Sequence, residues 1–217
     1  MHHLPKPPGS WREFLIEIAV IVLGVGVALG AEELLSDYHA NKEVATVQVS
    51  LNDELADSLF ASLERIKFAN CQTRALDRLD GVAHQSGSQP IGVLPASPMR
   101  LWGSAAWDAA VASGIIEEME HDERQAYAQL FSVVRTMKDW NTRERELWAI
   151  VRAYERRPPA TDDARHRFAE AVSQLRSLNG VMTLAARQLV DTAKPLNLQL
   201  TPADIAELRE PISCPAQ

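Results

Sequence analysis

The sequence predicts an all-α protein, in which an N-terminal transmembrane helix continues into an up-and-down helical bundle. Alanine, leucine, glutamate and arginine are abundant, and all four favour helices. Alternating strand patterns are scarce, whereas apolar residues recur at three- or four-residue spacing over long stretches. With 217 residues and 46% hydrophobic content, the chain can form one N-terminal segment and one domain with its own core.

The charge balance excludes one class of partner. The formal net charge is -7 at pH 7, and the sequence has no cluster of basic residues. A nucleic-acid-binding protein needs such a cluster to replace the counterions around phosphates. We therefore expect no nucleic-acid partner.

The stretch EFLIEIAVIVLGVGVALGAEE, residues 13–33, predicts the transmembrane helix. The eighteen residues 14–31 contain one charged side chain, Glu17. As a helix they extend about 27 Å, close to the hydrocarbon thickness of a bilayer. We interpret residues 13–33 as a signal-anchor helix that stays in the membrane. A cleavable signal peptide is the alternative, since Ala28 and Gly30 resemble a processing site.

The charges on either side of this stretch predict its orientation. Lys6 and Arg12 precede it, whereas Glu32 and Glu33 follow it. Basic residues stay preferentially on the cytoplasmic side of a bacterial inner membrane, so we expect a cytoplasmic N-terminus and a single pass. The expected parts are a short cytoplasmic tail over residues 1–12, the span over 13–33 and a helical periplasmic domain over 34–217.

Small residues form a stripe within the span. Gly24, Gly26, Ala28 and Gly30 recur at short spacing, and Gly26 to Gly30 fits the G-x-x-x-G pattern that lets two membrane helices approach closely. This pattern predicts a protein partner or a homo-oligomer held through the span. The alternative is that glycine is simply more frequent in membrane helices than in soluble ones.

Beyond the span, breaks in the apolar pattern predict where the helices begin and end. Gly81 ends the first long helix, and a Gly, Ser and Pro loop follows it. Thr161 and Thr201 are residues that cap helix N-termini, and Gly114 is a residue that terminates helices. The expected helices cover residues 34–79, 104–114, 122–156, 162–194 and 202–210.

Several short motifs resemble a known group of proteins. They are CQTRALDRLD at 71–80, SAAWDAAVASGII at 104–116, DERQAYAQLF at 122–131, Asn141 with Glu144, and a near-terminal Cys214. Together they resemble an uncharacterised family of single-span bacterial membrane proteins that is common in alphaproteobacteria. The resemblance implies a membrane-anchored helical domain outside the cytoplasm. It implies no activity.

The chain has two cysteines, Cys71 and Cys214. If the domain faces an oxidising periplasm, they form the one intrachain disulfide that is possible. That bond would close a long loop and stabilise the fold by at most about 4–5 kcal/mol. Two free thiols are the alternative.

No catalytic motif or cofactor fingerprint is present. The six histidines are scattered, without the spacing of metal ligands, and no nucleophile elbow or phosphate-binding loop occurs. The acidic turn from Glu117 to Asp122 could hold a metal, but consecutive acids before a helix usually compensate the helix dipole. We therefore expect no metal, no cofactor and no enzyme activity.

Three polar residues interrupt the apolar stripes of the two clearest helices. Asn141 and Glu144 lie on the inward face of one helix, between Met137 and Trp148, and Asn179 lies on the inward face of the next. Buried polar groups need partners, so the three are expected to bond to one another and to an arginine. A small ligand pocket is the alternative.

These observations favour a membrane-anchored periplasmic helical interaction module, or an accessory subunit of a membrane complex. The alternative is an extracytoplasmic domain that senses a small ligand and acts through a partner. A helical bundle on a membrane helix suits both functions. The predicted cytoplasmic tail is too short to be an output domain of its own.

Overall fold

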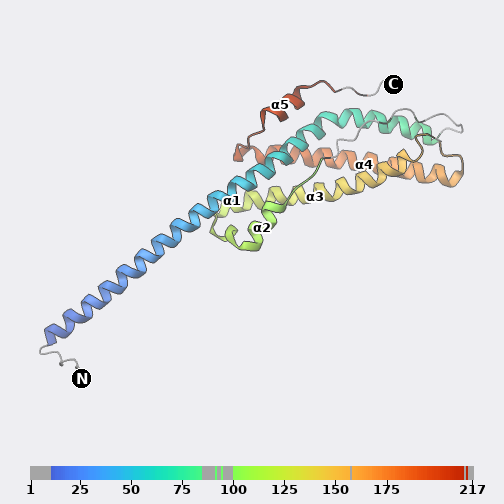
Figure 1. Cartoon of the computed structure of the whole chain (residues 1–217). Helices are drawn as coiled ribbons and strands as arrows, with labels where there is room; N and C mark the ends of the chain where they lie inside the picture. The colour runs from blue at the N-terminus through green and yellow to red at the C-terminus, as the bar shows by residue number, and fades with distance from the viewer. Residues whose placement is uncertain are drawn as a thin grey trace. The chain divides into compact units, whose positions relative to one another are not determined.

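The computed structural model describes residues 11–84, 91, 94, 100–156, 158–212 and 214. Within this part of the chain the regular secondary structure is entirely helical, which confirms the all-α class (Figure 1). The elements are α1 (Trp11–His84), α2 (Ala105–Ser113), η1 (Ile115–Glu118), α3 (His121–Arg152), α4 (Asp162–Ala193), η2 (Lys194–Leu196) and α5 (Pro202–Arg209). The chain divides into unit 1, Met1–Thr46, and unit 2, Val47–Gln217.

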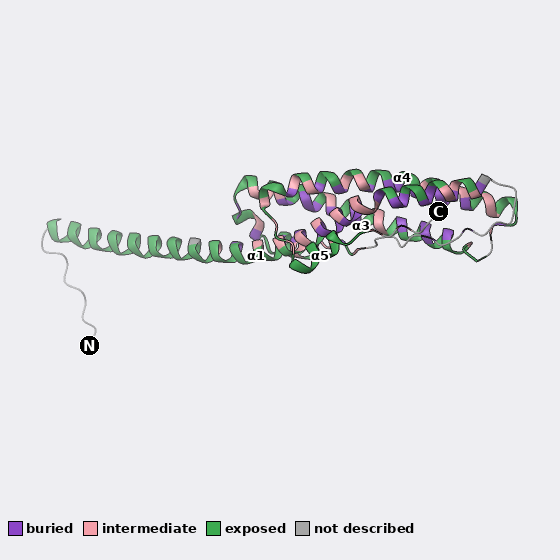
Figure 2. Cartoon of the chain, turned by 90° about the horizontal axis from the view of Figure 1, so that it is seen from above, coloured by how far each residue is buried: buried purple, intermediate pink, exposed green. Residues whose placement is uncertain are grey.

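Unit 1 is described as the N-terminal part of helix α1. Every residue from Trp11 to Ser36 is exposed (Figure 2). Among the described residues, α1 is the one helix long and apolar enough to cross a membrane. Gly24, Gly26 and Gly30 have open space where a side chain would begin. Among the described residues, the predicted stripe of small residues is therefore exposed.

In unit 2, helices α1, α3 and α4 bury residues at alternating spacings of three and four. Such a heptad pattern keeps one seam of each helix facing its neighbours, as in a coiled coil. Purple buried faces point toward one another in Figure 2. The seam of α1 is Leu51, Leu55, Ser58, Ser62, Arg65, Ala69, Gln72, Leu76, Leu79 and Ala83. The seam of α3 includes Tyr127, Leu130, Val134, Met137, Glu144, Trp148 and Val151, and that of α4 includes Phe168, Val172, Leu175, Asn179, Met182, Ala186 and Leu189.

The directions of the helices differ from a strict up-and-down order. Gln48 bonds to Glu123 at 2.7 Å and Arg65 to Glu144 at 2.6 Å, so α1 and α3 run parallel. Helix α4 is antiparallel to both, with Arg176 of α4 2.5 Å from Asp77 near the end of α1. The up-and-down prediction therefore holds for α3 with α4, but not for α1 with α3.

The long connection after α1 explains this difference. Ala105, at the start of α2, donates its backbone N–H to Glu54 at 2.8 Å, about thirty residues before α1 ends. The chain must therefore return roughly 45 Å along the helix between the end of α1 and the start of α2. Ile91, Leu94 and Trp102, all on this connection, are buried. The connection thus contributes to the core as well as reversing the chain.

Most helix ends lie where local chemistry predicts them. The Thr161 hydroxyl accepts the Ala164 N–H at 3.2 Å, and Thr201 forms a reciprocal capping box with Asp204. Gly114 adopts a left-handed conformation, with φ of 79°, at the end of α2. The prediction that Gly81 ends α1 is wrong, because the helix continues to His84 and buries Leu79 and Ala83 on either side of the glycine.

Glu54 provides a testable cap for α2. Its carboxylate accepts the backbone N–H groups of Ala105 at 2.8 Å and Ala106 at 3.0 Å, at the positive end of the α2 dipole. We expect Glu54→Ala to lower the free energy of unfolding by about 1–2 kcal/mol, as for loss of an N-cap. Hydrogen exchange should become faster in α2, and less so elsewhere.

The exposed neighbour Asp53 offers the matched control, since no hydrogen bond to it is found among the described residues. Asp53→Ala should leave α2 exchange unchanged. Gly103→Ala should act like Glu54→Ala, because its new Cβ would lie 2.6 Å from the Glu54 Oε1 atom. Equal exchange in α2 for all three variants and the wild type would contradict this role of Glu54.

Candidate functional site

A buried ion pair lies in the core of unit 2. Arg65 of α1 donates from Nη1 to Glu144 Oε2 at 2.6 Å and from Nη2 to Oε1 at 2.8 Å, a two-pronged contact. Each side chain is 2% exposed. Planar guanidinium and carboxylate groups match each other in this geometry. The pair therefore joins α1 to α3 through charges that water cannot reach.

Asn179 adds the third helix to this contact. Its carbonyl oxygen accepts a longer hydrogen bond of 3.4 Å from Arg65 Nη2, and its amide donates to Thr73 Oγ1 at 3.1 Å. Arg65, Glu144 and Asn179 each occupy a seam position of their helix. We call these three residues the polar layer. A polar residue at such a position fixes the register of packed helices, because any shift would strand it without partners.

The structure brings together two of the three predicted polar residues. Glu144 and Asn179 meet through Arg65, whereas Asn141 is half-buried and has no hydrogen bond within the described part of the chain. Sequence analysis missed Arg65 itself. The signal was present, since alternating steps of three and four from Leu51 to Leu79 pass through Arg65.

The side chains in the middle of the α1 seam are small or polar on both sides of the polar layer. Ser58 Oγ, both amide atoms of Gln72, and Nε1 of Trp148 are buried without a partner among the described residues. Each such group costs about 1–3 kcal/mol of desolvation. Buried polar atoms without a described partner therefore lie close to the polar layer along α1 and α3.

The Arg65 and Glu144 side chains of the polar layer are not accessible to a substrate. Both Glu144 oxygens already accept hydrogen bonds from Arg65, and the carboxylate lies away from solvent. A general base must reach the proton of a bound substrate. The geometry therefore supports a structural role for these residues.

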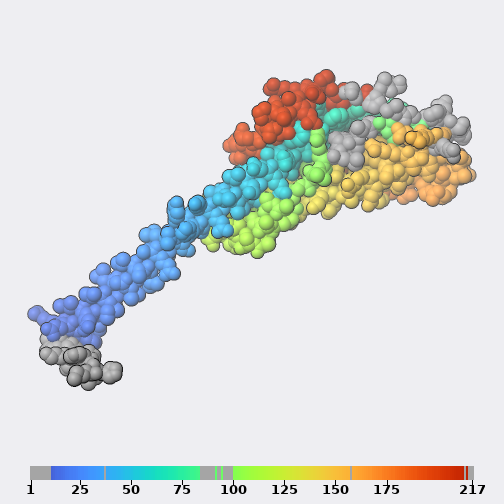
Figure 3. All heavy atoms as spheres, viewed as in Figure 1, coloured from blue at the N-terminus to red at the C-terminus, as the bar shows by residue number. Residues whose placement is uncertain are grey.

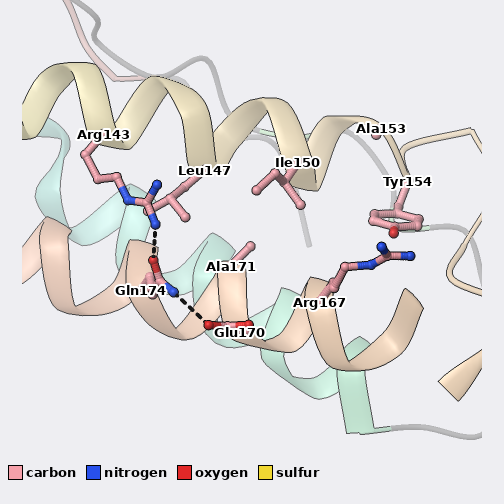
Figure 4. A pocket seen from close by; sticks show the side chains of 9 residues that line it. All are labelled: Arg143, Leu147, Ile150, Ala153, Tyr154, Arg167, Glu170, Ala171 and Gln174. Atoms are coloured by element: carbon pink, nitrogen blue, oxygen red, sulfur yellow. Dashed lines mark hydrogen bonds between the residues drawn. The ribbon is translucent and has the colours of Figure 1, made fainter. Parts of the chain in front are cut away.

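An open hollow lies on the surface between α3 and α4, with a volume of about 450 Å³ (Figure 4). Arg143 donates to Gln174 at 2.8 Å, and Gln174 donates to Glu170 at 3.1 Å. Arg167 is 2.7 Å from Asp163, so the rim charges are largely compensated. The floor is apolar, and the lining residues are Arg143, Leu147, Ile150, Ala153, Tyr154, Arg167, Glu170, Ala171 and Gln174.

The acidic residues of the turn before α3, from Glu117 to Asp122, are exposed. Glu117 pairs with Arg124 at 2.9 Å, as expected for a solvated turn. Among the described residues, no group of three histidine, cysteine or acidic side chains is placed to hold a metal ion.

Shifted pKa values occur at contacts between elements. The hydrogen bond from Arg135 lowers the pKa of Asp108, and the Ser104 hydroxyl acts in the same direction. Burial raises the pKa of the Tyr127 phenol, and the Glu123 carboxylate adds to this. Neither Asp108 nor Tyr127 lines the hollow between α3 and α4. Both shifts therefore arise at packing contacts between elements.

The two cysteines lie together on the outer side of unit 2. Their sulfur atoms are 2.21 Å apart, at disulfide distance, and their Cα atoms are 5.7 Å apart. Arg74 Nη2 lies 3.3 Å from the Cys214 sulfur. The structure thus brings together the predicted pair across 143 residues of sequence.

Comparison of the chain with models of protein families, with curated proteins and with solved structures finds no match. The resemblance to single-span bacterial membrane proteins therefore stays a prediction.

Proposed function

We propose that this protein is a membrane-anchored, non-catalytic interaction module, an accessory subunit whose unit 2 contacts another protein. The observation that carries the proposal is the N-terminal part of α1. Its apolar side chains are exposed from Trp11 to Ser36, and no described part of the chain covers them. Contiguous exposed apolar surface of this size is stable in lipid or against a partner, and it is unfavourable in water.

The proposed location is a bacterial inner membrane, with a cytoplasmic N-terminus and unit 2 in the periplasm. The basic and acidic flanks of the span support this orientation. The distance between Cys71 and Cys214 supports it independently, because structural disulfides belong to oxidising compartments. The exposed stripe of Gly24, Gly26 and Gly30 would let a second span pack closely.

Unit 2 has features that suit binding of another protein. The charges of its polar layer are buried and paired within the core. On the surface, Val181 and Leu184 are exposed at neighbouring positions of α4. Leu184 is 68% exposed. Partly apolar surface rimmed by polar groups is typical of a contact site between proteins.

The alternative function is sensing of a small ligand. The hollow between α3 and α4 favours it, since an apolar floor and a polar rim are common in ligand sites. Against it, Arg143 and Arg167 at the rim already bond to side chains of the same unit. We therefore place interaction with a protein first.

Co-purification tests the two functions. The full chain, extracted from its native membrane in mild detergent, should carry a stoichiometric protein partner. Leu184→Asp should release that partner without lowering the melting temperature, because the side chain is exposed. Ser173→Asp, exposed on α4 about 16 Å before Leu184, is the matched control and should retain it. A chain that purifies alone and melts at a higher temperature with a metabolite extract would instead support the sensor.

A further inference from the structure

The chain after α4 turns back and lies on α1 (Figure 3). We call residues 197–212 with Cys214 the strap. It contains α5, and no residue of α5 is buried. An isolated helix of eight residues is unstable in water, so α5 depends on what holds it against unit 2.

Exposed polar contacts connect the strap to the rest of unit 2. Lys67 of α1 donates to the backbone carbonyl oxygens of Glu207, at 3.3 Å, and Glu210. Arg100 bridges Glu64 of α1, at 2.7 Å, and Glu207 of α5. Exposed ion pairs contribute roughly 0–1 kcal/mol each. These contacts orient the strap, but they stabilise it weakly.

The strong link is the bond between Cys71 and Cys214. It joins the C-terminal part of α1 to the far end of the strap, while α4 holds the near end. A covalent link at that end prevents the strap from diffusing away when its polar contacts break. We infer that the strap is a redox-controlled closure: it lies on α1 while Cys71 and Cys214 are bonded, and it opens when a dithiol reduces them.

The opening step can be written in full. A thiolate of the dithiol attacks the Cys214 sulfur, which is the more exposed of the two, whereas Cys71 is 6% exposed. A mixed disulfide forms, and Cys71 leaves as a thiolate that takes up a proton. The second thiol of the dithiol then displaces Cys214 and forms the disulfide of the reductant. The guanidinium of Arg74 is placed to stabilise the departing Cys214 thiolate.

Opening would uncover one side of α1 and leave the core intact. The seam joining α1, α3 and α4 includes neither Cys71 nor any residue of the strap. On the strap side, Phe60 is 8% exposed and lies 5.0 Å from the Arg100 guanidinium that also bonds to Glu207. Loss of Glu207 would leave Arg100 bonded to Glu64 alone and would remove the strap from this part of α1. The closure therefore governs access to a defined strip of the surface.

Hydrogen exchange of the full chain in mild detergent tests the inference. Dithiothreitol serves as the dithiol, and exchange is compared before and after reduction. We expect exchange in residues 202–210 to rise about tenfold or more on reduction, while α3 and α4 keep their protection. The double variant Cys71→Ser/Cys214→Ser should show fast exchange in the strap with or without dithiothreitol.

Two outcomes would overturn the inference. Equal exchange in the strap before and after reduction would mean that its polar contacts suffice. Loss of protection throughout α3 and α4 on reduction would mean that the bond stabilises the whole of unit 2 and is no local closure. Neither outcome depends on the proposed membrane location, because the measurement needs only the purified chain.

Discussion

Replacing Glu144 by alanine is expected to lower the free energy of unfolding of unit 2 by about 3–5 kcal/mol, because it strands Arg65 as a buried cation without its partner. The substitution removes both hydrogen bonds that Arg65 donates to Glu144, of 2.6 and 2.8 Å. Denaturant unfolding of the full chain in detergent, followed through tryptophan fluorescence, measures the change. Trp148, one turn along α3 from Glu144, is buried and should report it.

Two further variants separate the cost of a stranded charge from the value of the contact. The apolar pair Arg65→Met/Glu144→Leu should cost much less than Glu144→Ala, because no charge remains in the core. Arg143→Ala removes an exposed ion pair with Glu146 on the same helix and should change stability by less than about 1 kcal/mol. If the apolar pair were as unstable as the single variant, the buried charge would not be the cause. A different result would favour a ligand site. In it, a metabolite extract raises the melting temperature of the wild type but not that of Glu144→Ala.

The second large effect is expected on membrane insertion, when two positive charges are placed in the middle of the apolar part of α1. The variant Val22→Arg/Leu23→Arg places two cations where both native side chains are exposed and apolar. Each arginine near the centre of a span costs about 2.5–3.5 kcal/mol on insertion scales. We expect most of the protein to leave the membrane fraction in alkaline carbonate extraction.

Val49→Arg provides the matched control for the span. Val49 is exposed on the same helix but belongs to unit 2. This variant should stay in the membrane fraction as the wild type does. Retention of Val22→Arg/Leu23→Arg to the same extent would contradict a lipid-embedded α1.

The parts of the fold that sequence analysis predicted are those set by local chemistry. Thr161, Thr201 and Gly114 act within a few residues of themselves, so their neighbours alone determine the helix ends. The apolar seams of α3 and α4 follow from spacing along each helix. Cys71 and Cys214 could be paired because the chain has no other cysteine.

The features that were missed depend on contacts between distant segments. The parallel direction of α1 and α3 follows from the long connection between α1 and α2, whose path no local pattern encodes. Gly81 is tolerated inside α1 because Leu79 and Ala83 pack into the core on both sides of it. Arg65 acquires its role from Glu144, 79 residues later in the chain. In each of these cases, contacts between distant segments determine the structure, and local residue propensity does not.

Labelling of single cysteines tests the central proposal, that α1 crosses the membrane and unit 2 lies outside. In the Cys71→Ser/Cys214→Ser background, Ser10→Cys and Asp53→Cys place one thiol before and one after the apolar stretch. Intact cells with a permeable outer membrane are treated with a maleimide that cannot cross the inner membrane. We expect Asp53→Cys to be labelled at once, and Ser10→Cys to be labelled only after the inner membrane is opened. Three results would contradict the proposed anchor. In the first, both variants are labelled in intact cells, and in the second, Asp53→Cys is labelled only after the inner membrane is opened. The third result is that Ser10→Cys is labelled under neither condition.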